Sequence, residues 1–178
     1  MKTLKFLSTI LVLTLFGCAS TSAVLSEFDE SIDFDKYTTY VLCIDDLFVE
    51  NTNYPNHDNN QVRAMIGDAI EKEMDSKGHK TNVLNPELQA GFRLTVQEKE
   101  AQFTNCEQES EYGYWKECTI DTVIYTEETL VLYVSDIDKN QVIWQASLTC
   151  DLNRSKGKIE DYVNELVETM FNEYPKVR

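Results

Sequence analysis

The feature of this sequence that most constrains its fold is an apolar stripe near the C-terminus. Apolar side chains recur there three and four residues apart, which is the spacing of one face of an α-helix. Pro175 follows and ends the helix, because proline lacks the N–H that a helix interior needs. A helix with one apolar face packs against a second layer, so the stripe predicts a layered domain. The stripe consists of Ile159, Tyr162, Val163, Leu166, Val167, Met170, Phe171 and Tyr174.

A β-hairpin is predicted directly before this helix. Two stretches of alternating residues, about Thr122 to Ser135 and Gln141 to Leu152, flank the short polar turn Asp136–Asn140. Such a turn predicts antiparallel pairing, and a period of two is typical of strands with one wet face. On the second strand the predicted buried face consists of Val142, Trp144, Ala146, Leu148, Cys150 and Leu152, and the wet face of Gln145, Ser147, Thr149 and Asp151.

Three further elements complete the predicted domain. Phe34 to Ile44 predicts a lead-in and a first strand, and Ala90 to Phe103 a second strand. Between them, apolar residues from Val62 to Met74 repeat at helical spacing, and Gly78 stands where a helix C-cap belongs. The order is β-α-β-β-β-α. We predict an α+β two-layer sandwich with a mostly antiparallel four-stranded sheet and two helices on one face.

The N-terminus is typical of an export signal. Lys2 and Lys5 give a basic start, and an uncharged stretch from Phe6 to Phe16 follows. This stretch is about half of the ~20 residues that span a bilayer as a helix, so a permanent transmembrane anchor is not expected. Leu15-Phe16-Gly17-Cys18 resembles the bacterial lipobox, in which the cysteine is acylated and the peptide before it is removed. The alternative is an ordinary secretory signal that contains an unmodified cysteine.

Cys18 is thus the predicted lipidation site and sets the expected organisation of the chain. Residues 1–17 are the signal peptide, residues 18–30 the lipidated N-terminus and tether, and residues 31–178 a single α+β domain. Several acyl chains hold a protein firmly on a membrane, because each buried methylene adds about 0.8 kcal/mol. Ala19 follows Cys18 where an aspartate would resemble an inner-membrane retention signal. We therefore expect an outer-membrane anchor with the domain facing the periplasm.

The charge of the chain excludes one class of partner. It has 31 acidic and 16 basic residues, a net charge of −15. Removal of residues 1–17 deletes two lysines and no acids, which leaves 31 acids against 14 bases, or −17. A field of this sign repels nucleic-acid phosphates and anionic lipid surfaces. We expect no nucleic-acid binding.

Four cysteines remain besides Cys18. An even number in an exported chain predicts disulfides, with three possible connectivities. Our preferred pairing is Cys106 with Cys118, which closes a local loop, and Cys43 with Cys150 in the body of the domain. Buried free thiols are the alternative for the second pair. No Cys-x-x-Cys or histidine pair accompanies the cysteines, so a zinc site is not predicted.

Parts of the sequence resemble a known family. Ile32-Asp-Phe-Asp-Lys-Tyr37 with Thr39-Tyr40 resembles the opening motif D-F-x-x-Y-x-T-Y of the bacterial lipoprotein family called domain of unknown function 4136. The segment from Tyr125 to Gln145 is similar to its central hairpin, with Glu128 standing where that family usually has glycine. The resemblance covers about Phe34 to Pro175. It implies a periplasm-facing, lipid-anchored α+β domain of unknown activity, and supplies no catalytic residues.

Motifs for catalysis are scarce. His57 and His79 are the two histidines, and neither lies in a His-Glu-x-x-His arrangement. His79 follows Gly78 at a predicted helix end, where we expect a capping or loop role. Glu127 and Glu128 are neighbours on a strand and point to opposite faces, so they do not converge on one substrate atom. We expect no enzyme activity, no metal and no cofactor.

An acidic, aromatic stretch from Asn105 to Glu117 is predicted to be a loop. It contains Tyr112, Tyr114 and Trp115, and a bridge between the flanking cysteines would stiffen it. Exposed aromatic side chains on a rigid loop are typical of binding hot spots, so these three residues are the candidate binding site. The alternative is that the rings fold back and complete the core.

Two readings of the function follow. The first is a non-enzymatic envelope lipoprotein, a module at the outer membrane that binds an envelope protein or a cell-wall component through the aromatic stretch or the wet face of the sheet. The second is a lipoprotein that binds a small molecule or lipid in a pocket between helices and sheet. A hydrolase built on scattered carboxylates is the weakest alternative, since it requires a converging pair in a cleft.

Overall fold

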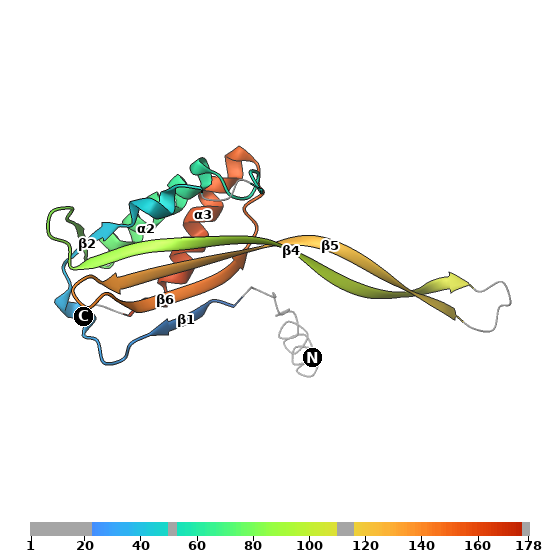
Figure 1. Cartoon of the computed structure of the whole chain (residues 1–178), viewed down its shortest axis with the longest axis horizontal. Helices are drawn as coiled ribbons and strands as arrows, with labels where there is room; N and C mark the ends of the chain where they lie inside the picture. The colour runs from blue at the N-terminus through green and yellow to red at the C-terminus, as the bar shows by residue number, and fades with distance from the viewer. Residues whose placement is uncertain (1–22, 50–52, 110–115, 176–178) are drawn as a thin grey trace, which may run out of the picture.

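The computed structural model describes residues 23–49, 53–109 and 116–175, which form a sheet covered on one face by two helices (Figure 1). The α+β class and the two helices confirm the prediction. In chain order the elements are β1 (Leu25–Phe28), the 3-10 helix η1 (Phe34–Lys36), β2 (Thr39–Leu42), the 3-10 helix η2 (Ile44–Leu47), α2 (Asn60–Ser76), β3 (Lys80–Thr81), β4 (Leu88–Glu109), β5 (Lys116–Asp136), β6 (Gln141–Cys150) and α3 (Lys156–Phe171).

The sheet is larger and more mixed than the predicted four-stranded one. Its six strands lie in the order β1-β6-β5-β4-β2-β3. The pairs β1–β6, β6–β5 and β5–β4 are antiparallel, whereas β2 runs parallel to both β4 and β3. The unpredicted strands are the two edges. β1 corrects the assignment of residues 25–28 to the tether: they pair with residues 144–147 of β6.

The two helices form where the sequence predicts them, except that α3 ends at Phe171, before the predicted end at Pro175. The Asn59 side chain caps α2 by accepting hydrogen bonds from the N–H groups of Gln61 and Val62, and Gly78 follows the helix with a φ of 94°. In α3 the apolar stripe is buried, apart from the half-buried Tyr162. Among the described residues, no helix is both long enough and apolar enough to cross a membrane.

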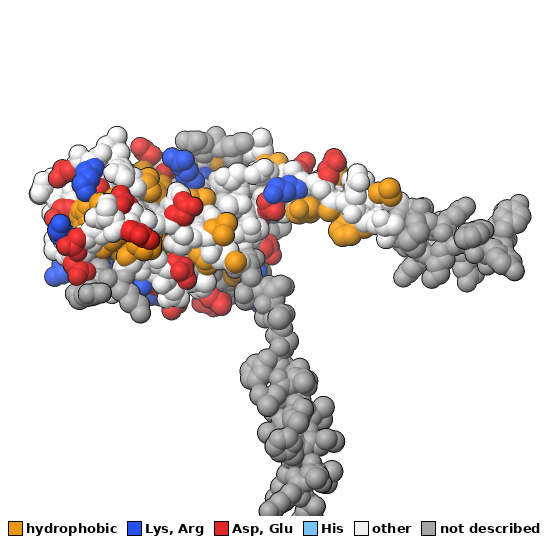
Figure 2. Space-filling model, turned by 90° about the horizontal axis from the view of Figure 1, so that it is seen from below, with side chains coloured by type: hydrophobic (Ala, Val, Ile, Leu, Met, Phe, Trp, Pro, Cys, Tyr) orange, Lys and Arg blue, Asp and Glu red, His pale blue; other side chains and the backbone are white. Residues whose placement is uncertain are grey.

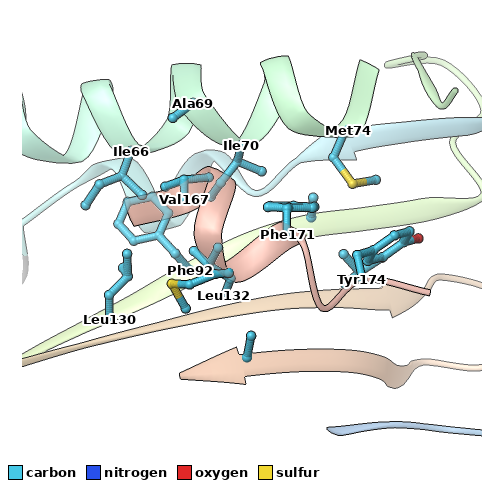
Figure 3. Close-up of a cluster of buried hydrophobic side chains, with 14 of the residues drawn as sticks. Ile66, Ala69, Ile70, Met74, Phe92, Leu130, Leu132, Val167, Phe171 and Tyr174 are labelled. Atoms are coloured by element: carbon cyan, nitrogen blue, oxygen red, sulfur yellow. The ribbon is translucent and has the colours of Figure 1, made fainter. Parts of the chain in front are cut away.

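The core fills the space between the helices and the sheet (Figure 3). Trp144 of β6 is fully buried, and its ring centroid lies 5.0 Å from that of Phe171 and 5.2 Å from that of Tyr174. Burying a large side chain of this kind contributes about 1.5 to 3 kcal/mol, and ring pairs add to it. Ile66, Ile70 and Met74 of α2 close the same core from above the sheet.

A β-bulge shifts the predicted pattern of β6. Val134 pairs with Trp144, but the next residue of β5, Ser135, pairs with Val142, which leaves Ile143 as an extra residue. Ile143 and Trp144 are therefore both buried, and Val142 is 48% exposed. The prediction that Val142 belongs to the buried face is wrong. Trp144, Ala146 and Leu148 are buried as predicted.

Strands β4 and β5 are much longer than predicted and extend together beyond the body of the domain (Figure 1). The backbone is extended up to Glu109 and again from Lys116, so most of the stretch predicted as a loop is strand. When both faces of a strand are exposed to solvent, its sequence lacks the alternation of apolar and polar residues from which strands are predicted.

Candidate functional site

We call residues 97–109 and 116–127 the ribbon. β6 pairs with β5 only from Glu128 to Asp136, and β2 pairs with β4 only from Leu88 to Ala90. The ribbon therefore consists of two strands with no further described strand beside them. An isolated two-stranded ribbon is marginally stable in water unless something packs against it.

Apolar side chains occupy both faces of the ribbon. Residues directly opposite each other across two antiparallel strands share a face. Ala101 lies opposite Val123, and Lys99 opposite Tyr125, whereas Glu100 lies opposite Ile124 on the other face. Figure 2 shows the hydrophobic side chains along the ribbon. The exposed fractions are 57% for Phe103, 69% for Ile120, 47% for Val123, 63% for Ile124 and 43% for Tyr125.

A buried carboxylate fastens the base of the ribbon. Glu128 is 2% exposed, and its Oε1 contacts Nδ1 of His57 in the loop before α2. Its Oε2 accepts a hydrogen bond of 2.5 Å from the Leu152 N–H, at the exit of β6. Glu127 points to the other face and pairs with Lys99, which confirms that the two glutamates do not converge. One side chain therefore joins β5, the loop before α2 and the connection to α3.

A second polar cluster lies beside this base. Arg63 of α2 donates two hydrogen bonds, of 2.6 and 2.8 Å, to the carboxylate of Asp58, and a third of 2.6 Å to the carbonyl of Asp46. The Asp46 carboxylate accepts hydrogen bonds from the Phe92 N–H at 2.9 Å and the Tyr133 hydroxyl at 2.7 Å. Burial and this bond raise the pKa of Tyr133, so its hydroxyl remains a donor at neutral pH.

The two described cysteine side chains are not paired. The Cys43 N–H donates to the Ala90 carbonyl, and Ala90 pairs with Val134 of β5, so Cys43 lies level with Val134. Cys150 instead pairs with Glu128 of β5. These positions are six residues apart along β5, about 20 Å, while a disulfide requires α-carbons within about 7 Å. The predicted Cys43–Cys150 disulfide is wrong, and both thiols are free. Burial, with the charge of Glu128, raises the pKa of Cys150 to about 12.

The remaining predicted site residues lie partly or wholly outside the described residues. Cys18, Tyr112, Tyr114 and Trp115 all lie outside them. The backbone of Cys106 lies in β4 and that of Cys118 in β5, where Asn105–Thr119 and Gln108–Glu117 are successive pairs. The irregularity between these pairs sets Cys106 and Glu107 against Cys118. The cysteine side chains are outside the described part, so their disulfide stays a prediction.

His79 is part of the core rather than an exposed loop residue. Its Nδ1 lies 3.0 Å from the Tyr37 carbonyl and its Nε2 lies 3.2 Å from the Tyr174 hydroxyl. The carbonyl accepts only, so Nδ1 carries the proton and Nε2 accepts from Tyr174 in the neutral ring. Burial lowers the pKa of His79. The His79 N–H also donates to the Met74 carbonyl at 3.1 Å, which caps the end of α2 as predicted. The side chain in addition joins Tyr37 to Tyr174 in the core, which the sequence did not predict.

Three hollows of about 180 to 260 Å³ lie on the surface of the described chain. They lie at the β1–β6 edge, on the solvent-exposed face of the sheet, and beside β4. None of these three lies in the space between helices and sheet that the ligand-binding alternative requires. No group of three or more histidine, cysteine, aspartate or glutamate residues is placed to hold a metal ion within the described ranges.

Comparison with known proteins places this geometry in a family. A family model described as "Domain of unknown function (DUF4136)" matches residues 24–176. No curated protein matches the chain. Among solved structures, a DUF4136 family protein from Bacteroides thetaiotaomicron is similar with a TM-score of 0.52 and 14% identity, and the match covers 88% of this chain and 97% of that one.

Two further solved structures are similar. A PDZ domain protein from Parabacteroides distasonis has a TM-score of 0.55 and 12% identity, and the match covers 88% of this chain. It covers 36% of that protein, so this chain spans about a third of its length. The PelC dodecamer from Paraburkholderia phytofirmans has a TM-score of 0.46 and 8% identity, with 84% of this chain and 94% of that chain covered, which is too distant to carry an argument. Likeness at these identities bears on the fold alone.

Proposed function

Because the chain belongs to the domain of unknown function 4136 family, which has no assigned activity, we propose its function from its own surface. It is a non-enzymatic binding module, anchored by lipid in the cell envelope, and the ribbon is the surface through which it contacts a protein partner.

The exposed apolar side chains of the ribbon carry this proposal. Phe103, Val123 and Tyr125 share one face of the ribbon and are 57%, 47% and 43% exposed, on an element that only two described strands form. Soluble proteins rarely expose contiguous apolar side chains, and where they do the patch is commonly a contact surface. Burying apolar surface stabilises a complex by about 25 cal/mol per Å² before the costs of association. The ribbon therefore gains from a partner that covers it.

The buried polar groups support a non-enzymatic role. The Cys150 thiol, whose pKa is about 12, stays protonated at neutral pH and is a poor nucleophile. Both Glu128 oxygens are engaged, one with His57 and one with the Leu152 N–H. The carboxylate of Asp58 is held by Arg63. These groups hold loops against strands, and their hydrogen bonds explain why they are buried without invoking a substrate.

Lipidation at Cys18 supports the proposed location. Six residues separate Cys18 from Leu25, the first residue of β1, which makes seven steps of at most about 3.6 Å each in an extended chain, so the start of β1 would lie within about 25 Å of the anchored cysteine. At that distance the module reaches proteins on or near the membrane surface. Labelled palmitate should enter the wild-type protein and not Cys18→Ala, and equal labelling would refute the anchor.

A matched pair of variants tests the ribbon. Val123 on the ribbon and Val142 on β6 are both strand valines, 47% and 48% exposed. In the native envelope, chemical crosslinking followed by purification should recover a specific adduct with wild type and with Val142→Thr. The adduct should be lost or strongly reduced with Phe103→Ser combined with Val123→Thr. Equal adducts from all three proteins would overturn the proposal, since the ribbon would then not be the contact.

A further inference from the structure

Beyond Ala90 the outer edge of β4 has no partner strand among the residues that the structure describes. The Cys43 N–H donates to the Ala90 carbonyl at 2.8 Å, and the Phe92 N–H donates to Asp46 Oδ2 at 2.9 Å. Both partners lie on the side of β4 away from β5. The backbone groups of these even-numbered residues therefore point away from the β4–β5 ladder.

This direction continues along the strand. Backbone groups of a strand alternate between its two edges with a period of two. Leu94, Val96, Glu98 and Glu100 therefore present N–H and C=O groups on the outer edge, while Thr95 and Gln97 bond to β5. Among the described strands only β5 pairs with this part of β4. A row of unpaired backbone groups is a template for one more strand.

A hollow lies along the same edge. It has a volume of about 180 Å³ and is lined by Leu94, Thr95 and Val96 together with Tyr54 and Asp58. Consecutive strand residues point to opposite faces, so a hollow that touches three in a row lies at the edge of the strand. The loop before α2 thus forms a wall opposite the unpaired edge, with room for a side chain of an added strand.

The charge near this edge selects the kind of segment that binds. Residues 97–127 contain eight acidic residues and two lysines. The Asp58 carboxylate is already held by Arg63, so the acids offered to a ligand at this edge are Glu98 and Glu100, which are both exposed. Opposite charge attracts a partner, and like charge repels one. A basic segment fits, whereas a second copy of this acidic ribbon does not.

We propose that the β4 edge from Leu94 to Glu100 binds an extended, basic segment of a partner protein as an additional strand, with one of its side chains in the hollow beside Tyr54. The inference rests on the proposed function, because it names how the ribbon holds its partner. Main-chain hydrogen bonds to alternate residues of β4 supply the affinity, and the two glutamates and the hollow supply the preference for sequence.

Amide hydrogen exchange, measured on the folded protein from residue 23 to residue 178, tests the strand addition directly. The probe is an acetylated and amidated decapeptide of alternating lysine and valine. At saturation, exchange should slow by about tenfold or more at Leu94, Val96, Glu98 and Glu100, because their N–H groups gain acceptors. Exchange at Thr95 and Gln97, which already bond to β5, should not change. The same peptide with every second amide N-methylated keeps its charge and should not protect these residues.

Charge reversal supplies the second measurement. Glu98→Lys combined with Glu100→Lys should weaken peptide binding by about tenfold, through loss of attraction and added repulsion. Glu160→Lys combined with Glu168→Lys, two exposed acids of α3, makes the same change in net charge and should leave binding nearly unchanged. Equal losses from both pairs would overturn the proposal, since binding would then follow net charge rather than this edge.

Two other outcomes would also overturn it. Binding without slower exchange at the even-numbered residues would show that the peptide lies elsewhere. Slower exchange that appears without peptide and increases with protein concentration would show that a second copy occupies the edge. Crosslinking of the Val123 and Phe103 variants in the envelope tests separately whether the ribbon binds a partner at all. If those variants lose the adduct but the edge shows no protection, the binding role of the ribbon stands and strand addition fails.

Discussion

Replacing Glu128 by alanine is expected to destabilise the domain by about 2 to 5 kcal/mol, because it removes a buried hydrogen-bonding carboxylate and leaves a cavity. The structure supplies two contributions. The Leu152 N–H loses its acceptor at 2.5 Å, and an unsatisfied buried donor costs about 1 to 3 kcal/mol. The His57 ring loses its partner and β5 gains a small cavity, which together account for the remainder.

Urea unfolding followed by circular dichroism measures this change. The matched control is Glu127→Ala, the adjacent residue on the same strand, whose side chain pairs with Lys99 on the exposed face. That change should leave the unfolding free energy unchanged within error, because exposed pairs contribute little. Glu128→Gln, which keeps an oxygen to accept from Leu152 N–H, should lose less than the alanine variant.

A double-mutant cycle separates the two contributions. His57→Ala and Glu128→Ala together should cost less than the sum of the single changes, since each alone removes the same contact. If Glu128→Ala proves as stable as Glu127→Ala, the buried carboxylate does not fasten the base of the ribbon and the reasoning is refuted.

Three further predictions concern other parts of the domain. Gly91→Ala should lower the free energy of unfolding in urea by about 1 to 3 kcal/mol, because the added Cβ would lie 2.3 Å from Asp46 Oδ2 and 2.4 Å from the Tyr133 hydroxyl oxygen. Gly157→Ala, with open space around it, should not destabilise the domain. Burial lowers the pKa of His79, so its contribution to stability is fully present above the unfolded value of about 6.5 and is lost as pH falls towards the folded value. Thermal unfolding between pH 7.5 and 5 should therefore show a steeper loss of stability on acidification in wild type than in His79→Gln, and equal slopes would contradict this. Labelling with iodoacetamide at pH 8, read by peptide mass spectrometry, should modify Cys150 at least about a hundredfold more slowly than a model thiol, since a pKa of about 12 leaves little thiolate; labelling at the model rate would contradict the burial of this thiol.

The elements that the sequence predicts are those with a periodic apolar face. The stripe from Ile159 to Tyr174, the repeat from Val62 to Met74 and the alternation around Trp144 each reflect burial directly. Both helices and the central hairpin are predicted from these three patterns. β1 has four residues and depends on pairing with β6, more than a hundred residues away, so nothing local predicts it. The bulge at Ile143 likewise depends on the register with β5.

The site was less predictable than the fold, although one signal was present. Glu128 falls at an inward position of β5, in line with Leu130, Leu132 and Val134, and a carboxylate in such a row indicates a buried partner. Its partner His57 lies 71 residues earlier in a polar loop, so the sequence does not name it. The ribbon carries apolar residues on both faces, which gives no alternation to recognise.

Site-specific photocrosslinking in the native envelope tests the central claim most directly. A photoreactive residue at Ile124 on the ribbon is compared with one at Leu84, which is 97% exposed on the body of the domain. The ribbon position should form a discrete adduct with a protein of the envelope, and the position on the body should form none despite its greater exposure. Equal adducts from both positions, or an adduct from Leu84 alone, would contradict the claim that the ribbon is the surface by which this protein binds.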